Sequence, residues 1–291
     1  MRPFLNLFGA NPSHDQLHPF ETSWLLSSDI FAALRGLFAL YIFTTIFFIY
    51  GWEGTHDNSH AIGTSFGYFT WLNFWGMGFY FLVASIHTLC YARTGRSVIF
   101  DRLPRFFRAL HSLYYACVTT YPFLVLIVYW SILYTPPWFP VVFNAWQNVS
   151  ECIPPLPVSQ HGLIGLFSLL EILLPTTQPH PFLHLAFLIL ILLLYLCLAY
   201  IVHHTQGYYT YNFLNPGAHG EHSGRVAGYS IGILVGITVV FAVSWGLIWV
   251  RQRQVAGKIK RSARDRDYSY GAFQAGLEAD RLNDGGAWRE K

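Results

Sequence analysis

The stretch "HGLIGLFSLLEILLP", residues 161–175, decides how many times this chain crosses a membrane. It offers about 14 residues suited to a span, or about 21 Å of helix, whereas a full crossing takes roughly 20 residues. We expect it to span if the preceding "PLPVSQ", residues 155–160, is partly buried or if the membrane is thin there. Five longer apolar stretches accompany it, at about 30–50, 66–91, 113–134, 183–203 and 228–250.

The composition points to the same class of protein. Hydrophobic residues make up 53% of the 291 residues and charged residues 11%, whereas an average soluble protein has roughly 25% charged residues. The sequence therefore predicts an all-α fold, a polytopic transmembrane helix bundle surrounded by the bilayer. We expect no nucleic-acid partner.

The distribution of charge predicts the orientation. Five arginines fall in the segment "RTGRSVIFDRLPRFFR", residues 93–108, whereas residues 51–65 and 135–160 contain no Lys or Arg. By the positive-inside rule the arginine segment is cytosolic. Residues 251–266 hold seven further basic residues, and they return to the cytosol only if 161–175 also crosses. We therefore predict about six spans with both termini cytosolic.

Three parts of the chain follow from this pattern. Residues 1–29 form an N-terminal cytosolic segment, 30–250 a transmembrane helical domain, and 251–291 a basic, flexible cytosolic tail. The acceptor sequon "NVS" at 148–150 fits a lumenal loop, where N-glycosylation takes place. The expected location is the endoplasmic reticulum or the plasma membrane.

Polar residues inside the spans are the candidate functional residues. Thr70 and Asn73 interrupt the apolar run "GYFTWLN", residues 67–73, and His161 begins the short fourth span from the same side of the membrane. The topology brings the Thr70 hydroxyl and the His161 imidazole to one depth, as a nucleophile and its base require. Each residue also has a structural explanation, because a helical threonine often bonds back to a carbonyl one turn earlier, and a histidine at a helix start often faces the interface.

Glu171 is the most unusual residue of the predicted spans. An acid about ten residues into a span is costly in hydrocarbon, so it should face the interior of the bundle. We expect it to pair with Arg35 or to bond with hydroxyl groups. It lies some 15 Å along the helix from His161, which is too far to orient that ring.

Four motifs resemble a known family when taken together and in order. They are "YFTWLNFW" at 68–75, "VYWSILY" at 128–134, "QHGLIGLFSLLEILLP" at 160–175 and "GYYTYNFL" at 207–214. Their order and spacing are similar to the androgen-induced multipass family, which includes the androgen-induced gene one protein and the androgen-dependent TFPI-regulating protein. The resemblance covers about residues 30 to 215.

The resemblance implies an intramembrane hydrolase that cleaves fatty acid esters of hydroxy fatty acids or similar lipids. It places the catalytic threonine at Thr70 and the catalytic histidine at His161, with a lipid as substrate and no cofactor. The i, i+3 spacing from Thr70 adds Asn73 as a possible oxyanion donor, with a bond to another helix as its alternative. The rolling-stone type of membrane protein is similar almost to the same degree, and it implies no activity.

Other functions stay open at this level. His87 with His111, and His161 with His203, are spaced as two pairs of axial ligands that would hold two haems in an electron-transfer protein. The motifs "HDNSH", "HHT" and "HGEH", at 56–60, 203–205 and 219–222, offer side chains of the types that bind metals, although exposed loops often carry such histidines without a metal. A non-enzymatic multipass protein is the third alternative.

Overall fold

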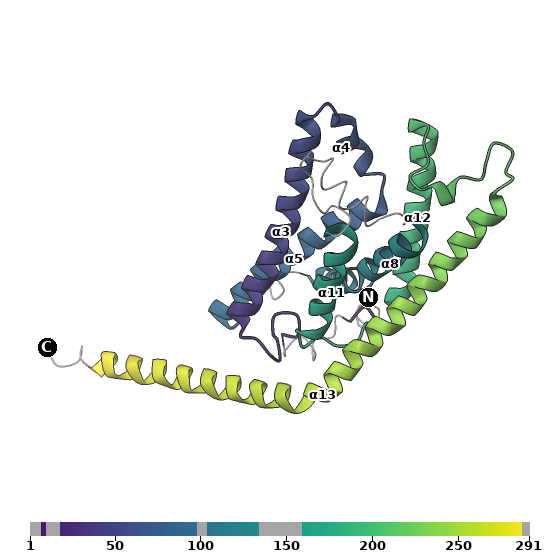
Figure 1. Ribbon diagram of the computed structural model, residues 1–291. Coiled ribbons are helices and arrows are strands. Elements are labelled where there is room, and N and C mark those ends of the chain that lie inside the picture. Colours follow the sequence, from purple (N-terminus) through teal and green to yellow (C-terminus); the bar gives the residue numbers. More distant parts are fainter. Residues whose placement is uncertain (1–6, 10–17, 98–103, 134–158, 287–291) are drawn as a thin grey trace.

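The computed structural model describes residues 7–9, 18–97, 104–133 and 159–286. The regular secondary structure of this part is helical, apart from an isolated bridge between Ser23 and Pro175. Five described helices are long and apolar enough to cross a membrane: Ser28–Thr55, Phe69–Thr94, Arg105–Leu133, Leu183–Gln206 and Ser223–Ala256. The chain is therefore an all-α integral membrane protein, as its sequence predicts (Figure 1).

The described elements follow one another as single helices and short turns. Their bounds are α3 (Ser28–Thr55), α4 (Ser59–Ser65), α5 (Phe69–Thr94), α7 (Arg105–Val118), α8 (Tyr121–Val128), η1 (Tyr129–Leu133), η2 (Ser159–Leu163), α11 (Ile164–Leu173), α12 (Leu183–Gln206), η3 (Asn212–Leu214) and α13 (Ser223–Gly286). The predicted fourth span is helical but short, with its apolar helix running over His161–Leu173. Residues 155–158 before it, and the sequon at 148–150, lie outside the described residues.

A buried ion pair joins the first span to the short one. The Arg35 guanidinium of α3 donates to both carboxylate oxygens of Glu171 in α11, and each side chain is only 1% exposed. The same guanidinium donates to the Thr88 hydroxyl of α5 at 2.7 Å and to the Phe20 carbonyl at 2.6 Å. The Tyr80 hydroxyl of α5 donates to the carboxylate at 2.8 Å. The pairing of Glu171 with Arg35 is therefore confirmed.

The two basic regions of the sequence reach the same end of the bundle. Arg93 at the end of α5 lies 3.7 Å from Asp29 at the start of α3. Arg251 of α13 donates to the carbonyl of Ile172 at the end of α11. We call this the basic end, and the opposite end, where α5 begins, the Thr70 end.

Small residues let α3 and α5 pack closely along their length. A Cβ atom on Gly78 of α5 would lie 3.0 Å from the Ile42 side chain, and one on Gly36 of α3 would lie 3.1 Å from the Ser85 hydroxyl. Ser85 in turn donates to the Ala32 carbonyl of α3 at 2.8 Å. Close approach over small residues is the usual basis of helix association in a membrane, where dispersion contacts replace the hydrophobic effect.

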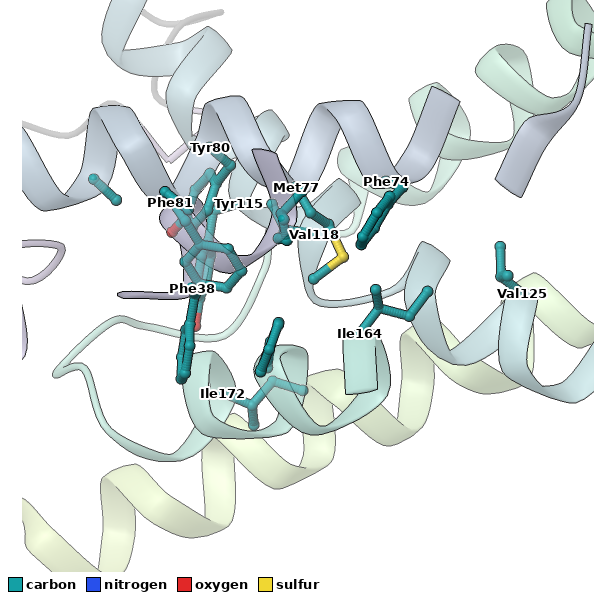
Figure 2. Packing of buried hydrophobic residues seen from close by; sticks show 14 of the residues in the cluster. Phe38, Phe74, Met77, Tyr80, Phe81, Tyr115, Val118, Val125, Ile164 and Ile172 are labelled. Atoms are coloured by element: carbon teal, nitrogen blue, oxygen red, sulfur yellow. The ribbon is translucent and has the colours of Figure 1, made fainter. Parts of the chain in front are cut away.

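Aromatic side chains fill the space between these helices and α11. Phe38 of α3 stacks on Phe167 of α11 with ring centroids 4.3 Å apart, and it meets Phe81 of α5 edge-on at 5.2 Å. Figure 2 shows this cluster, in which Ile164 of α11 lies beside Met77 and Phe74 of α5 and Ile172 belongs to the same buried group. The short helix is therefore part of the core.

A kink in the third span is tied to the same short helix. Pro122, in the first turn of α8, has no N–H, so the carbonyl four residues earlier loses its helical donor. That carbonyl belongs to Val118, and the Ser168 hydroxyl of α11 donates to it at 2.7 Å. This hydrogen bond gives the Val118 carbonyl a donor, which a backbone group inside a membrane protein needs because no water is available there.

The last helix is longer than the span predicted at 228–250. α13 runs from Ser223 to Gly286 without a break in the helix, and it continues well past the bundle (Figure 1). Residues 251–286 are thus helical, where the polar composition predicts a flexible tail. This segment contains no proline, so no residue in it lacks the N–H that continues the helical hydrogen bonds of the span.

The buried ion pair of Arg35 and Glu171 should contribute far more to stability than the exposed pair of Arg93 and Asp29. Glu171→Ala leaves the Arg35 charge buried without its partner, so we expect it to lower the free energy of unfolding by about 3–5 kcal/mol. The control Arg93→Ala removes an ion pair whose side chains are 76% and 64% exposed, and it should cost at most about 1 kcal/mol. Unfolding in detergent micelles measures both. Equal losses in the two variants would contradict the role given to Glu171.

Candidate functional site

The Thr70 hydroxyl contacts a side chain from a distant part of the chain. Thr70 is buried in the first turn of α5, and its hydroxyl lies 3.4 Å from the Tyr211 hydroxyl. Thr45, Thr88 and Thr119 instead bond back to the carbonyl four residues earlier. Thr70 differs from these three because it is the second residue of α5, so the carbonyl four residues earlier, that of Phe66, lies outside its helix.

Tyr211 is held in place by neighbouring aromatic rings. It lies between the turn at Gly207 and η3, stacks on Phe213 at 5.2 Å, and meets Tyr68 edge-on at 5.7 Å. Burial raises the pKa of the Tyr211 hydroxyl above its ordinary value. At neutral pH this hydroxyl therefore keeps its proton and remains a hydrogen-bond donor beside Thr70.

Thr70 and Tyr211 both line a cavity of about 240 Å³ at the Thr70 end. We call it the Thr70 cavity. Aliphatic and aromatic side chains of α5, α8, η1, α12, η3 and α13 form most of its wall. Leu193 of α12 and Ile231 of α13 belong to the wall and are also exposed on the outside of the helices. The cavity can therefore be entered from the side, where acyl chains of the bilayer lie.

His161 lies beside the wall of this cavity. It is buried in η2, and its ring stacks on Tyr129 of η1 with centroids 3.7 Å apart and planes within 4°. Tyr129 lines the Thr70 cavity. The Nδ1 atom of His161 is buried and has no hydrogen-bond partner among the described residues. A buried polar atom without a partner costs about 1–3 kcal/mol, which calls for an explanation.

The predicted nucleophile and base are neighbours of one cavity but are not bonded to each other. No hydrogen bond joins Thr70 to His161 in the described part of the chain, and the partner of Thr70 is Tyr211. Hydrogen bonds between catalytic groups often tighten only when substrate is bound. The arrangement thus places the Thr70 hydroxyl and the Tyr211 phenol on one apolar cavity, with the His161 imidazole stacked against Tyr129 of its wall.

Asn73 belongs to a different space. It lines a cavity of about 340 Å³ between α5, α7, α8 and α12, which we call the Asn73 cavity. Phe69 and Tyr195 line both cavities, whereas Thr70 lines only the first and Asn73 only the second. The geometry therefore gives no support to Asn73 as an oxyanion donor for Thr70. Glu171 lines neither cavity and serves the ion pair at the basic end.

The residues missed by the sequence argument are tyrosines. Tyr129 and Tyr211 stand in the motifs "VYWSILY" and "GYYTYNFL", so the signal was present in the resemblance. Their roles could not be recognised, because tyrosines at the ends of spans are usually interfacial anchors.

Of the two histidine pairs predicted as haem ligands, only one is formed by neighbouring rings. His87 and His111 are neighbours, with ring centroids 5.9 Å apart, but His111 also packs against Tyr80 at 5.7 Å. The other predicted pair does not form, since His161 stacks on Tyr129 and His203 stacks on Tyr209 instead.

The predicted metal-binding side chains do not converge. Within the described ranges, no three His, Cys, Asp or Glu side chains are grouped as a metal ion would require. All three motifs, at 56–60, 203–205 and 219–222, lie in those ranges.

No protein-family model, no curated protein and no solved structure matches this chain.

Proposed function

We propose that this protein is an intramembrane hydrolase of lipid esters, with Thr70 as nucleophile and His161 as base. The observation that carries the proposal is the contact between the Thr70 and Tyr211 hydroxyls, 3.4 Å apart, on residues that both line one apolar cavity. The unpartnered Nδ1 of His161, one ring away from the same cavity, adds support.

The reaction would run in two steps. His161 takes the proton of the Thr70 hydroxyl, and the oxygen attacks the ester carbonyl of the lipid. The bond to the leaving alcohol breaks as His161 returns the proton, which leaves an acyl-threonine. Water then attacks this second ester, the fatty acid is released and Thr70 recovers its hydrogen.

Tyr211 fits the role of oxyanion donor that the sequence argument gave to Asn73. Its hydroxyl lies beside the Thr70 oxygen, so it would also lie near the negative charge that develops on the carbonyl oxygen. The raised pKa of Tyr211 keeps the donated proton in place.

The wall of the Thr70 cavity and the resemblance support a lipid ester as the substrate class. The described residues of the wall include no charged side chain, which fits uncharged acyl chains. Esters of fatty acids with hydroxy fatty acids are the first substrates to test, in the endoplasmic reticulum or the plasma membrane.

Two substitutions test the assigned roles. Thr70→Ala should reduce hydrolysis to the background rate, because the attacking oxygen is gone. His161→Ala should reduce kcat by about 10²–10⁴-fold, the usual contribution of a general base. The measurement is release of fatty acid from a panel of lipid esters by purified protein.

Each variant has a matched control. Thr45→Ala removes a helical threonine that bonds only to its own helix, and His203→Ala removes a histidine that also stacks on a tyrosine. Both controls should keep normal activity. Hydrolysis that survives Thr70→Ala, or a wild-type protein inactive on the whole panel, would refute the proposal.

The tyrosine has its own test. Tyr211→Phe keeps the stacked ring and loses the hydroxyl, so we expect kcat to fall by about 10²-fold or more with little change in KM. Tyr200→Phe is the control, because the Tyr200 hydroxyl donates to the Leu214 carbonyl and lies outside the cavity wall. An unchanged kcat in Tyr211→Phe would remove the oxyanion role.

We also propose that the basic end faces the cytosol. The support is the position of Arg93 and Arg251 at one end of the bundle. In sealed microsomes, added protease should remove an epitope on the C-terminal tail and spare one inserted between Asp57 and Asn58. The reverse pattern would overturn this orientation.

A further inference from the structure

The Asn73 cavity is a second intramembrane space with no part in the reaction proposed above. Its volume is about 340 Å³, and its wall comes from α5, α7, α8 and α12. Leu194 of α12 belongs to the wall and is 60% exposed on the outside of the bundle. A molecule dissolved in the bilayer can therefore reach this cavity from the side.

The hydroxyl groups of the wall are already engaged. Tyr114 donates to the Gly76 carbonyl, Tyr121 donates to the Leu188 carbonyl at 2.8 Å, and Tyr195 donates to the Gly67 carbonyl at 3.1 Å. Because each of these hydroxyls already donates its proton to a backbone carbonyl, none of the three has a proton left to donate to a ligand.

The amide of Asn73 differs from these hydroxyls. Its Nδ2 atom is buried and has no hydrogen-bond partner among the described residues. Leaving a buried donor open costs about 1–3 kcal/mol, and a ligand with an acceptor atom would remove that cost. Asn73 is thus an amide residue of this cavity wall whose buried Nδ2 has no partner among the described residues.

The charge of the wall restricts the ligand. No Lys, Arg, His, Asp or Glu is among the described residues that line the cavity. A carboxylate would enter without a counter-charge and would pay the full cost of leaving water. An uncharged acceptor such as an ester carbonyl avoids this cost, and long acyl chains suit the apolar wall.

We propose that the Asn73 cavity binds a neutral acyl ester of the bilayer, whose carbonyl oxygen accepts a hydrogen bond from Asn73 Nδ2. This site is separate from the Thr70 cavity, and its occupancy does not depend on hydrolysis. A fatty acyl glycerol ester is the simplest ligand of this kind.

Photolabelling of the full-length protein tests the proposal. The probe is a monoacylglycerol that carries a diazirine and an alkyne on its acyl chain, with the free acid of the same chain for comparison. Labelled peptides identify the cavity, because α7 lines only the Asn73 cavity and residues 230–234 of α13 line only the Thr70 cavity. We expect saturable labelling of α7 by the ester and much weaker labelling by the acid.

Substitutions then assign the contact. Asn73→Leu keeps the size of the side chain and removes the donor, so the affinity measured on α7 should fall about three- to tenfold, the worth of one hydrogen bond. Leu198→Trp should fill the Asn73 cavity and abolish labelling of α7. Leu193→Trp, on the same helix but in the wall of the Thr70 cavity, should spare it.

A second readout does not depend on how well a bulky variant folds. The carbonyl stretch of a ¹³C-labelled ester should shift to lower frequency in the wild type, as expected for a hydrogen-bonded carbonyl, and should lose that shift in Asn73→Leu. The whole experiment is repeated in Thr70→Ala, which cannot hydrolyse the probe, and the labelling of α7 should be the same. Failure of the hydrolase proposal would thus leave this result unchanged.

Three results would overturn the inference. They are equal affinity in wild type and Asn73→Leu, labelling by the acid as strong as by the ester, and displacement of the probe by a sterol at lower concentration than by unlabelled ester.

Discussion

The buried pair of Arg35 and Glu171 is the constraint on which the rest of the bundle depends. An acid and a base inside a membrane protein are tolerated only when each charge is matched and each polar atom is bonded. Here the guanidinium and the carboxylate bond to each other, and the Thr88 and Tyr80 hydroxyls complete the set. Because these residues come from α3, α5 and α11, the pair fixes the three helices at one depth.

The short helix α11 shows how such a constraint compensates for length. Ten residues cannot cross a bilayer unaided, yet α11 is held by the ion pair, by the aromatic cluster around Phe167 and by the bond from Ser168 to Val118. In its last turn, the carbonyl of Ile172 accepts a hydrogen bond from Arg251 of α13. Polar bonds at its basic end and along its length thus hold α11 where apolar length alone would not.

The two ends of the bundle differ in what surrounds their polar groups. Near the basic end, the Arg35 and Glu171 side chains are matched within the protein, whereas Arg251 Nε is buried without a hydrogen-bond partner among the described residues. At the Thr70 end, the Thr70 hydroxyl meets only another hydroxyl, and buried nitrogen atoms of His161 and Asn73 stay open beside cavities. Unmatched groups next to apolar space are what a site for lipids needs, because the ligand supplies the missing partner.

The sequence by itself determined the helical class, the approximate positions of the spans, the inward direction of Glu171 and the place of both basic regions at one end, and it offered Arg35 as one of two kinds of partner for Glu171. These features are predictable because the bilayer acts on every segment in the same way: its hydrocarbon requires apolar helices and makes an unpaired acid very costly. Only the tertiary structure decided that Thr70 meets Tyr211, that His161 stacks on Tyr129, and that Asn73 lines a separate cavity. Residues three apart on a helix differ by roughly 60° in direction and about 4.5 Å in height, and the packing of neighbouring helices decides which space each of them enters.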